Sequence, residues 1–569
     1  MKSDKIIEGK KYVKKNPNLQ DYDRVVSSFS YKTYTQELTW FDKDTINAAY
    51  NAITRNTLSS RKNKLALLWE SEEGEKKKYT FADIEEISNQ IAHYLRHLGI
   101  EKGDRVFLFL PRIPELYFSF IAILKIGAVA GTLFSAFGPQ ALFDRLSQSG
   151  AKVLITTEEM AKRVQSVRKD LDKLEKIVLV NDNFTQEIAK MEKTYKVSHT
   201  HSEDNAFMLY TSGTTGKPKG IVHAHRAIIH QYLTAQWALD IQEDDVYWCT
   251  ADPGWVTGIA YGILGSWANG ATSIVYEGRF SPQKWYQILQ DYEVTIWYTA
   301  PTAIRMLAAQ GLDLIKKYDF SHLRYLASVG EPLNPEPIFW GLKAFHLPFH
   351  DNYWQTETGG IVVANYPGLP IKPGSMGKPF PGIKAHIVDD EGHELAENKI
   401  GNLALEPGWS SMMKEIWRRP EKYKSYFLKK YYITGDLAYK DADGYLWFVG
   451  RADDVIKTSG ERVGPFEVES ALVSHPAVVE AGVIGKPDPL RGQIIKAFVV
   501  LKPEIKQSEK LKEELMVHVK KNLAGHAYPR EIDFIDKLPK TRSGKIMRRI
   551  LKAKELGLPI GDTSTLEEY

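Results

Sequence analysis

The segment 210–220, which reads YTSGTTGKPKG, combines glycines, hydroxyl groups and lysines as phosphate-binding loops do. Small residues let backbone amides approach an anion closely. Hydroxyl groups that could donate further hydrogen bonds belong to Thr211, Ser212, Thr214 and Thr215. The segment is not a Walker loop, because Gly213 and Gly216 bracket only two residues and a proline follows Lys217. Taken alone, it fits a flexible surface turn equally well.

Two later segments could bind the rest of a nucleotide: 351–360 reads DNYWQTETGG and 431–436 reads YYITGD. The Asp436 carboxylate could accept hydrogen bonds from both ribose hydroxyls, and the Tyr353 ring could stack on a base. An aspartate after a tight turn is more commonly a solvated cap. Each segment, on its own, leaves both interpretations open.

A basic segment near the end of the chain, 538–549, reads LPKTRSGKIMRR. Composition alone favours a solvated loop or a phosphate-binding patch for nucleic acid. The aromatic residues that stack on bases are missing from this segment. Lys545, in a Ser-Gly turn, could instead reach into a cleft and neutralise charge that develops on a transferring group.

Three histidines, His223, His225 and His230, lie close enough in sequence to suggest a metal site. No cysteine or paired carboxylate accompanies them, so we expect ordinary packing histidines. The chain also lacks the G-x-S-x-G sequence of a serine hydrolase.

The elements that must position these segments alternate between apolar runs and helical periodicity, which predicts parallel sheets covered by helices. Thr80 and Asp83 suit the cap of a helix whose apolar residues recur at helical spacing up to Leu98. Next come a strand at 106–110, a helix at 114–125 and a strand at 129–134. Further strands are expected at 152–156, 177–180 and 294–299, with helices near 283–291 and 302–309.

Beyond residue 375 the pattern changes to strands separated by tight turns. Turn sequences at 390–392 and 443–444 predict antiparallel pairing. Strands near 479–484 and 494–501, with an amphipathic helix near 509–522, predict a small α+β domain at the end of the chain. A chain of 569 residues and 64.7 kDa is long enough for several such units.

Composition excludes several classes of protein. The formal net charge is +4, from 75 Lys and Arg against 71 Asp and Glu, so charge alone favours neither a nucleic acid nor a membrane partner. The most apolar stretch, 117–134, is interrupted by Lys125, Gly127 and Gly131. The first residues lack the apolar region of a signal peptide, and Cys249 has no partner for a disulfide. We therefore expect a soluble, cytoplasmic protein.

In this order and spacing, four motifs resemble those of the adenylate-forming acyl-CoA synthetase superfamily. They are YTSGTTGKPKG, YWQTETGG, YITGD followed by GRADDVIKTSGERVGPFEVES, and PKTRSGKIMRR. The resemblance extends from about residue 30 to 555. It implies an α/β fold with a large N-terminal domain, 1–452, of two helix-flanked sheets plus a distorted β-barrel. A small mobile α+β C-terminal domain, 453–569, would be hinged at Asp453.

The resemblance also implies an enzyme with two half-reactions that uses ATP, coenzyme A and Mg²⁺. A carboxylate first attacks the α-phosphorus of ATP to give an acyl-adenylate and pyrophosphate, and the thiol of coenzyme A then displaces AMP. Lys545 would be the catalytic residue of the first step. Because the second step needs this lysine out of the way, rotation of the C-terminal domain would let one site serve both reactions.

The family motifs assign the remaining roles by resemblance. The phosphates would contact Thr211, Ser212, Gly213, Thr214, Thr215, Gly216 and Lys219. The adenine side would be formed by Gly330, Glu331, Pro332 and Tyr353, with Thr356 at the α-phosphate. Further cofactor-binding residues would be Asp351, Asn352, Trp354 and Gln355. Asp436 and Arg451 would hold the ribose, Arg462 the phosphate side, and Ser459 and Gly460 the thiol channel. Glu357 would bind magnesium, and the backbone of Val473, His475 and Val478 would form a second metal site.

The identity of the acid depends on Trp354. Medium-chain relatives have glycine at this position, which leaves a tunnel for the alkyl chain, whereas an indole would fill it. The chain resembles the acetate-specific branch also in DPGWVTG and SVGEP, so Val256, Thr257, Val329 and Trp354 would surround a methyl group. Acetate is the expected acid, with propionate as a poorer substrate. Residues 525–530, GHAYPR, look more like the medium-chain branch, so a medium-chain acyl-CoA ligase is the alternative.

Two other expectations concern regulation and class. Acetylation of the lysine that matches Lys545 switches off relatives, so an acetyltransferase and a deacetylase acting on Lys545 are expected partners. A non-catalytic nucleotide-binding protein is the alternative of another class, although intact Lys545, Asp436 and Glu357 argue against it. A nucleic-acid binder ranks last.

Overall fold

The computed structural model describes residues 6–213, 216–458, 461–523, 527–540, 546–560, 563 and 566, and omits the side chains of 212, 213, 216, 217, 461 and 462. Several expected site residues lie outside the described residues: Thr214, Thr215, Ser459, Gly460 and Lys545. The side chains of Ser212 and Arg462 lie outside them too.

The first sheet carries the phosphate-loop motif on its last long hairpin. Its seven strands run in the order β18-β8-β7-β4-β3-β5-β6, parallel from β7 to β6 and antiparallel at the β7-β8-β18 edge. The bounds are β3 (Arg105–Phe109), β4 (Val129–Thr132), β5 (Val153–Thr156), β6 (Lys176–Leu179), β7 (Asn205–Gly213), β8 (Gly216–Ala224) and β18 (Glu415–Ile416).

The second sheet has nine strands in the order β15-β14-β13-β12-β11-β9-β10-β1-β2. The strands from β13 to β1 are parallel, with antiparallel pairs at both edges. Its bounds are β1 (Leu65–Glu70), β2 (Lys76–Thr80), β9 (Val246–Cys249), β10 (Thr272–Tyr276), β11 (Ile296–Thr299), β12 (Tyr325–Ser328), β13 (Phe349–Tyr353), β14 (Val363–Ala364) and β15 (Lys378–Pro379). The end of β13 leads into the YWQTETGG motif.

A third sheet, in the part of the chain where a distorted barrel is expected, is antiparallel. Its strands are β16 (Ala385–Val388), β17 (Gly401–Leu405), β19 (Phe427–Leu428), β20 (Tyr431–Lys440) and β21 (Leu446–Arg451). They run β16-β17-β20-β19, and β21 pairs with β20 so that Asp436 lies opposite Arg451. The two residues expected at the ribose are therefore neighbours across one hairpin.

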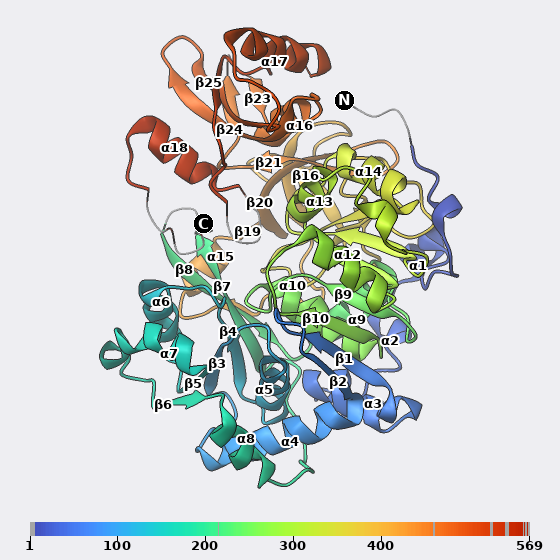
Figure 1. Ribbon diagram of the computed structural model, residues 1–569, viewed down its shortest axis with the longest axis vertical. Coiled ribbons are helices and arrows are strands. Elements are labelled where there is room, and N and C mark those ends of the chain that lie inside the picture. The colour runs from blue at the N-terminus through green and yellow to red at the C-terminus, as the bar shows by residue number, and fades with distance from the viewer. Residues whose placement is uncertain are drawn as a thin grey trace.

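A separate sheet follows Arg451 and forms one end of the molecule, at the top of Figure 1. Its strands are β22 (Ile456–Thr458), β23 (Glu461–Val463), β24 (Val478–Asp488), β25 (Gly492–Leu501) and β26 (Glu531–Phe534). Apolar residues of β24 and β25 share a small core with α16 and α17 that is distinct from the main core. The expected α/β class, with a large N-terminal part and a separate C-terminal domain, is confirmed.

The helices begin and end largely where sequence patterns predict. Thr80 and Asp83 form a complete capping box at the start of α4, as predicted. Helix α5 has the predicted bounds, with proline at its first position. The bounds are α1 (Tyr22–Ser28), α2 (Tyr31–Tyr34), α3 (Arg55–Thr57), α4 (Phe81–His97), α5 (Pro114–Lys125), α6 (Pro139–Ser149), α7 (Glu158–Gln165), α8 (Asp182–Ala189), α9 (Ala227–Trp237), α10 (Val256–Ile259), α11 (Gly265–Ala268), α12 (Pro282–Asp291), α13 (Pro301–Ala308), α14 (Pro335–Phe345), α15 (Pro420–Lys424), α16 (Pro465–Val473), α17 (Glu509–Asn522) and α18 (Arg548–Leu556).

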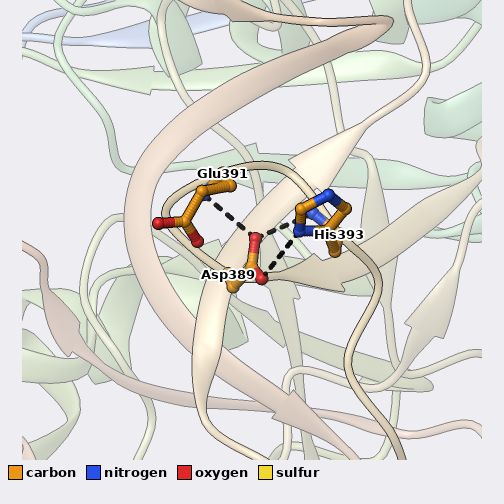
Figure 2. A group of neighbouring side chains, drawn as sticks. All are labelled: Asp389, Glu391 and His393. Atoms are coloured by element: carbon orange, nitrogen blue, oxygen red, sulfur yellow. Dashed lines mark hydrogen bonds and ion pairs between the residues drawn. The ribbon is translucent and has the colours of Figure 1, made fainter.

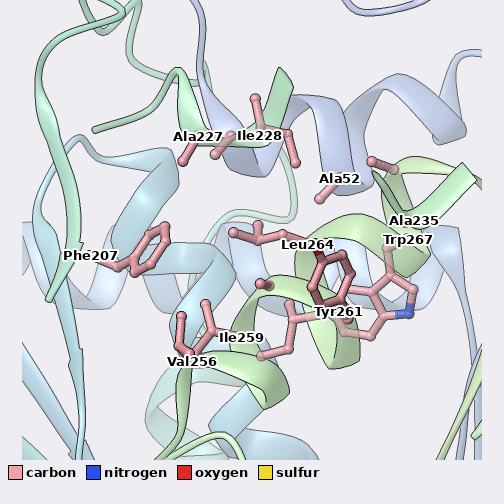
Figure 3. Packing of buried hydrophobic residues seen from close by; sticks show 14 of the residues in the cluster. Ala52, Phe207, Ala227, Ile228, Ala235, Val256, Ile259, Tyr261, Leu264 and Trp267 are labelled. Atoms are coloured by element: carbon pink, nitrogen blue, oxygen red, sulfur yellow. The ribbon is translucent and has the colours of Figure 1, made fainter. Parts of the chain in front are cut away.

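The main core continues between the two large sheets. Figure 3 shows part of it, with Phe207 of the first sheet at the left, Val256 and Ile259 of α10 lower down, and Tyr261 and Trp267 at the right. Burial of such large side chains contributes about 1.5–3 kcal/mol each, which fixes the two sheets against each other. Within the described ranges, no helix is long and apolar enough to cross a membrane.

Candidate functional site

The loop after β13 brings Glu357, the expected metal ligand, next to the hairpin of β7 and β8. This hairpin carries the expected phosphate loop and is called the phosphate hairpin below. Lys219 of β8 lies 2.9 Å from a carboxylate oxygen of Glu357, and Tyr426 contacts both side chains through its hydroxyl. The Lys219 ammonium also lies 4.7 Å from the centre of the Tyr426 ring. Burial raises the pKa of Glu357, but the charge and the hydrogen bond of Lys219, with smaller contributions that include Arg451, together lower it below its ordinary value. Glu357 is therefore an ionised carboxylate beside the phosphate hairpin, and its oxygens could ligate a cation.

Three side chains behind this loop fix its backbone. His223 contacts the carbonyl oxygen of Thr356 at 2.8 Å through Nε2 and that of Ser411 at 3.1 Å through Nδ1. Gln231 donates to the Gly359 carbonyl at 2.9 Å, and His230 contacts the Ile361 carbonyl at 2.8 Å. Burial lowers the pKa of His223 to about 4, and likewise that of His230. Both histidines are buried, and their rings contact backbone carbonyls.

Gly359 must be glycine for the loop to pass so close to these supports. Its φ is +66°, and a Cβ atom there would lie 2.1 Å from the carbonyl oxygen of Ser411. The first glycine of the motif thus shapes the backbone that presents Thr356 and Glu357.

The residues expected at the ribose and the base meet around one carboxylate. Asp436, which is 4% exposed, accepts hydrogen bonds from the Tyr353 hydroxyl at 2.6 Å and from the Gln355 amide at 2.8 Å. Its other oxygen faces Arg451 Nε at 3.3 Å. Gln355 is itself fixed by Tyr432, whose hydroxyl donates to the amide oxygen at 2.9 Å. Burial first, and Asp436 next, raise the pKa of Tyr353, so the phenol stays a donor.

The turn expected on the adenine side follows β12. Gly330 has a φ of +94°, and Glu331 is held by Arg305 at 2.7 Å and by the Thr302 hydroxyl at 2.8 Å, both from α13. On the neighbouring strand, Asp351 is 4% exposed and burial raises its pKa well above the ordinary value. The turn 330–332 is thus attached to a helix rather than left free.

The residues expected around the acid belong to the main core. Val256 and Val329 are 8% and 7% exposed, and the partly buried Trp354 packs against the same cluster. The rings of Trp354 and Tyr261 are nearly perpendicular, with centres 5.1 Å apart and planes at 89°. Thr257 follows Val256 in the short helix α10. An aromatic wall therefore closes this part of the core next to the nucleotide loop.

Asp453, the expected hinge residue, and both ends of the segment that carries Lys545 take part in ion pairs. Asp453 is in the turn between β21 and β22, 3.6 Å from Arg451 Nε. Lys540, before the undescribed residues 541–545, forms a short ion pair with Glu480, and Arg548 pairs with Glu469. The ends of the segment that carries Lys545 are thereby attached to the C-terminal sheet and α16.

Two groups of residues are candidates for a metal site, one predicted from the sequence and one found in the structure. His475 lies in the turn after α16, where its carbonyl accepts from the Val478 amide at 3.0 Å and its ring contacts Glu514 at 3.2 Å. The role of Val473, His475 and Val478 remains a prediction. Within the described residues, Asp389, Glu391 and His393 form a cluster of possible ligands. Figure 2 shows the Asp389 carboxylate instead closing its own turn through the amides of Glu391 and His393, at 3.0 and 2.8 Å.

Sequence motifs did not identify several tyrosines of the site. Tyr426 precedes the YYITGD motif, Tyr432 is its second residue but was given no role, and Tyr261 and Tyr298 contact Trp354. Tyrosines are common in cores, and these come from distant parts of the chain, so no spacing marks them. The sequence feature that could have indicated Tyr426 and Tyr432 is the high aromatic content around YITGD.

Comparisons with known proteins agree with this architecture. The model of the AMP-binding enzyme family matches residues 54–417, and that of its C-terminal domain matches 467–545. The chain is 52% identical to acetyl-coenzyme A synthetase of Bacillus subtilis strain 168, over 97% of this chain and 98% of that protein. It is 40% identical to acetyl-coenzyme A synthetase of Pyrobaculum aerophilum, over 93% and 86%.

Solved structures extend the comparison. An anthranilate CoA ligase in complex with anthranoyl-AMP is 33% identical with a TM-score of 0.83, covering 91% of this chain and 98% of that one. An acyl-CoA synthetase of Brucella canis is 36% identical with a TM-score of 0.73, covering 94% and 99%. The chain belongs to the AMP-binding enzyme family. The resemblance to adenylate-forming enzymes is confirmed.

Proposed function

We propose that the protein ligates acetate to coenzyme A with ATP, through an acetyl-adenylate, releasing pyrophosphate and AMP. The observation that carries the proposal is the indole of Trp354, which meets Tyr261 and packs against the main core, to which Val256 and Val329 also belong. An alkyl tunnel at this position would need a small residue. Two relatives that bear the name acetyl-coenzyme A synthetase support the same acid.

In the first half-reaction the protein must hold two anions together. Attack of acetate on the α-phosphorus brings a carboxylate to a polyanion, so cations must offset the repulsion. The Lys219 ammonium could bind a phosphate group of ATP if its ion pair with Glu357 breaks. Arg451 lies beside Asp436 at the proposed ribose end. Tyr353 and Gln355, which now donate to Asp436, would turn toward the nucleotide as the ribose hydroxyls replace them.

Glu357 fits a magnesium ligand. It is an ionised carboxylate beside the proposed phosphate site, and Mg²⁺ commonly takes one or two carboxylates together with substrate phosphates. When bound, the ion would neutralise phosphate charge. Lys219, which now pairs with Glu357, would have to move away from it.

The second half-reaction requires a different arrangement of the C-terminal domain. We place the domain boundary at Asp453, which lies between the two family matches and in the turn between two separate sheets. Lys545 would act in the first step and leave in the second, when Ser459 and Gly460 line the thiol path. Acetylation of Lys545 would remove its charge and stop adenylation, so an acetyltransferase and a deacetylase are proposed partners.

Exchange of pyrophosphate into ATP, measured with acetate, propionate, butyrate and hexanoate, tests the proposal. We expect acetate to give the highest kcat/KM and propionate a value lower by about ten- to a hundredfold, because a methylene is worth about 1–3 kcal/mol in such a pocket. A preference for hexanoate would favour the medium-chain alternative. No exchange and no AMP with any acid would favour a non-catalytic nucleotide-binding protein.

A further inference from the structure

Tyr298 is fully buried on β11, next to the indole of Trp354, and belongs to none of the sequence motifs. Its hydroxyl accepts from Trp354 Nε1 at 3.4 Å and donates to Asn352 Oδ1 at 2.8 Å. The Asn352 amide nitrogen in turn donates to the Ser328 carbonyl at 2.9 Å. Four groups thus form one chain of hydrogen bonds that runs from β12 to the indole.

The direction of every proton in this chain is determined. An indole nitrogen can only donate and a backbone carbonyl can only accept. Trp354 must therefore donate to Tyr298, whose own proton must point to Asn352, whose amide hydrogens face Ser328. A buried chain in which each group has one possible role holds its members in one arrangement.

A second contact fixes the other side of the indole. Tyr261 meets Trp354 edge to face, and it meets Tyr298 with ring centres 6.0 Å apart at 84°. Its hydroxyl accepts from the Ile361 amide at 2.7 Å and lies 2.8 Å from Thr234 Oγ1. The indole is thus held by a hydrogen bond at its nitrogen and by a ring that is itself anchored to the backbone.

We propose that Tyr298 is a positioning residue that sets the selectivity for short acids, by holding the Trp354 indole at the end of the acid pocket. The inference rests on the proposed function. An acid with one more methylene must displace the indole, and the resistance to that displacement includes the hydrogen bond to Tyr298. The phenol reaches the acid only through Trp354, so it acts on the ratio between acids rather than on the reaction itself.

Tyr298→Phe tests the proposal because it removes one oxygen and keeps the ring. We expect the ratio of kcat/KM for acetate to that for propionate to fall about two- to tenfold, the value of one net hydrogen bond, while the KM for ATP stays unchanged. Tyr286→Phe is the matched control. Its ring is also fully buried, but its hydroxyl has no hydrogen-bond partner among the described residues and lies in a different core cluster.

A double-mutant cycle identifies the route of the effect. Trp354→Phe removes the donor end of the chain, so we expect lower selectivity from this variant alone, and no further loss when Tyr298→Phe is added. In protein labelled with 5-fluorotryptophan, the ¹⁹F resonance that is missing in Trp354→Phe should move in Tyr298→Phe and stay in place in Tyr286→Phe.

The outcomes separate this inference from the proposed function. If the unaltered protein activates acetate but Tyr298→Phe lowers kcat/KM equally for both acids, Tyr298 is structural and the inference is wrong. The same holds if Tyr298→Phe changes the ratio as much in the Trp354→Phe background, or if Trp354→Phe alone leaves the ratio unchanged. If the unaltered protein activates no acid, the proposed function itself fails.

Discussion

Trp354 and Glu357 lie three positions apart on one loop, and we propose different roles for them: Trp354 bounds the acid pocket and Glu357 binds magnesium. The sequence predicted both from the YWQTETGG motif, because the family resemblance covers consecutive residues. It did not predict that Lys219 and Tyr426 surround Glu357, since these contacts join residues 138 and 69 positions away. Motifs locate a functional side chain, but partners from distant elements become known only from the fold.

Replacement of the indole is the residue-scale prediction. In Trp354→Gly we expect kcat/KM for hexanoate to rise and that for acetate to fall, changing their ratio at least tenfold, because the cavity left by the ring accepts an alkyl chain. The four-acid exchange assay measures this directly. An unchanged chain-length profile would mean that the indole does not bound the pocket.

At the scale of elements, α4 and α5 are joined by a buried ion pair. Lys125 is completely buried and lies 2.7 Å from Glu85 and 2.6 Å from Asn89, both on α4. Burial lowers the pKa of Lys125, and Glu85 opposes that shift. Helix α5 packs on β3 and β4 of the first sheet, so this pair determines how α4 lies over the sheet that carries the phosphate hairpin.

Removal of the Glu85 charge should cost more stability than removal of the Lys125 charge, because Lys125 is completely buried and Glu85 is not. We expect Glu85→Gln to destabilise by about 3–5 kcal/mol, since it leaves a buried ammonium without its counter-charge. Lys125→Met, which fills the same space without a charge, should cost less. Urea unfolding followed by tryptophan fluorescence compares the two, with Lys190→Met, in an exposed pair, as the control. Equal losses would contradict this account.

Element boundaries show where sequence prediction ended. The helix cap at Thr80 and the bounds of α5 were predicted correctly because caps and periodicity are local. The strand predicted at 479–484 extends as β24 to Asp488. Pairing with β25 continues through Gly485 and Pro487 to the turn end of the hairpin, where Asp488 lies opposite Gly492.

At the scale of the whole molecule, the main question is how two sheets on either side of Asp453 share one site. The sequence predicted the division from a change of pattern and from the family motifs. It could not predict how the C-terminal segment is attached, for example through Arg548 and Glu469, because such pairs join residues 79 positions apart. Long-range charge pairing leaves no local pattern.

Lys545→Gln tests the division of labour between the domains. Glutamine lacks the charge, as acetyl-lysine does, so we expect pyrophosphate exchange to fall at least a hundredfold, about 2.7 kcal/mol of lost transition-state stabilisation. Thioester formation from supplied acetyl-adenylate and coenzyme A should persist. Lys545→Arg, which keeps the charge, is the control. Loss of both half-reactions in Lys545→Gln would contradict a lysine that serves only the first.

Strand β13 has a consequence for how this protein can change. Neighbouring side chains of a strand point to opposite faces, so Asn352 reaches Tyr298 behind the indole while Tyr353 reaches Asp436 at the ribose end. A slip of one position along β12 would exchange these two side chains and misplace both at once. Changes of acid preference are therefore expected to arise by substitution within β13, whereas insertions or deletions there should abolish nucleotide and acid recognition together.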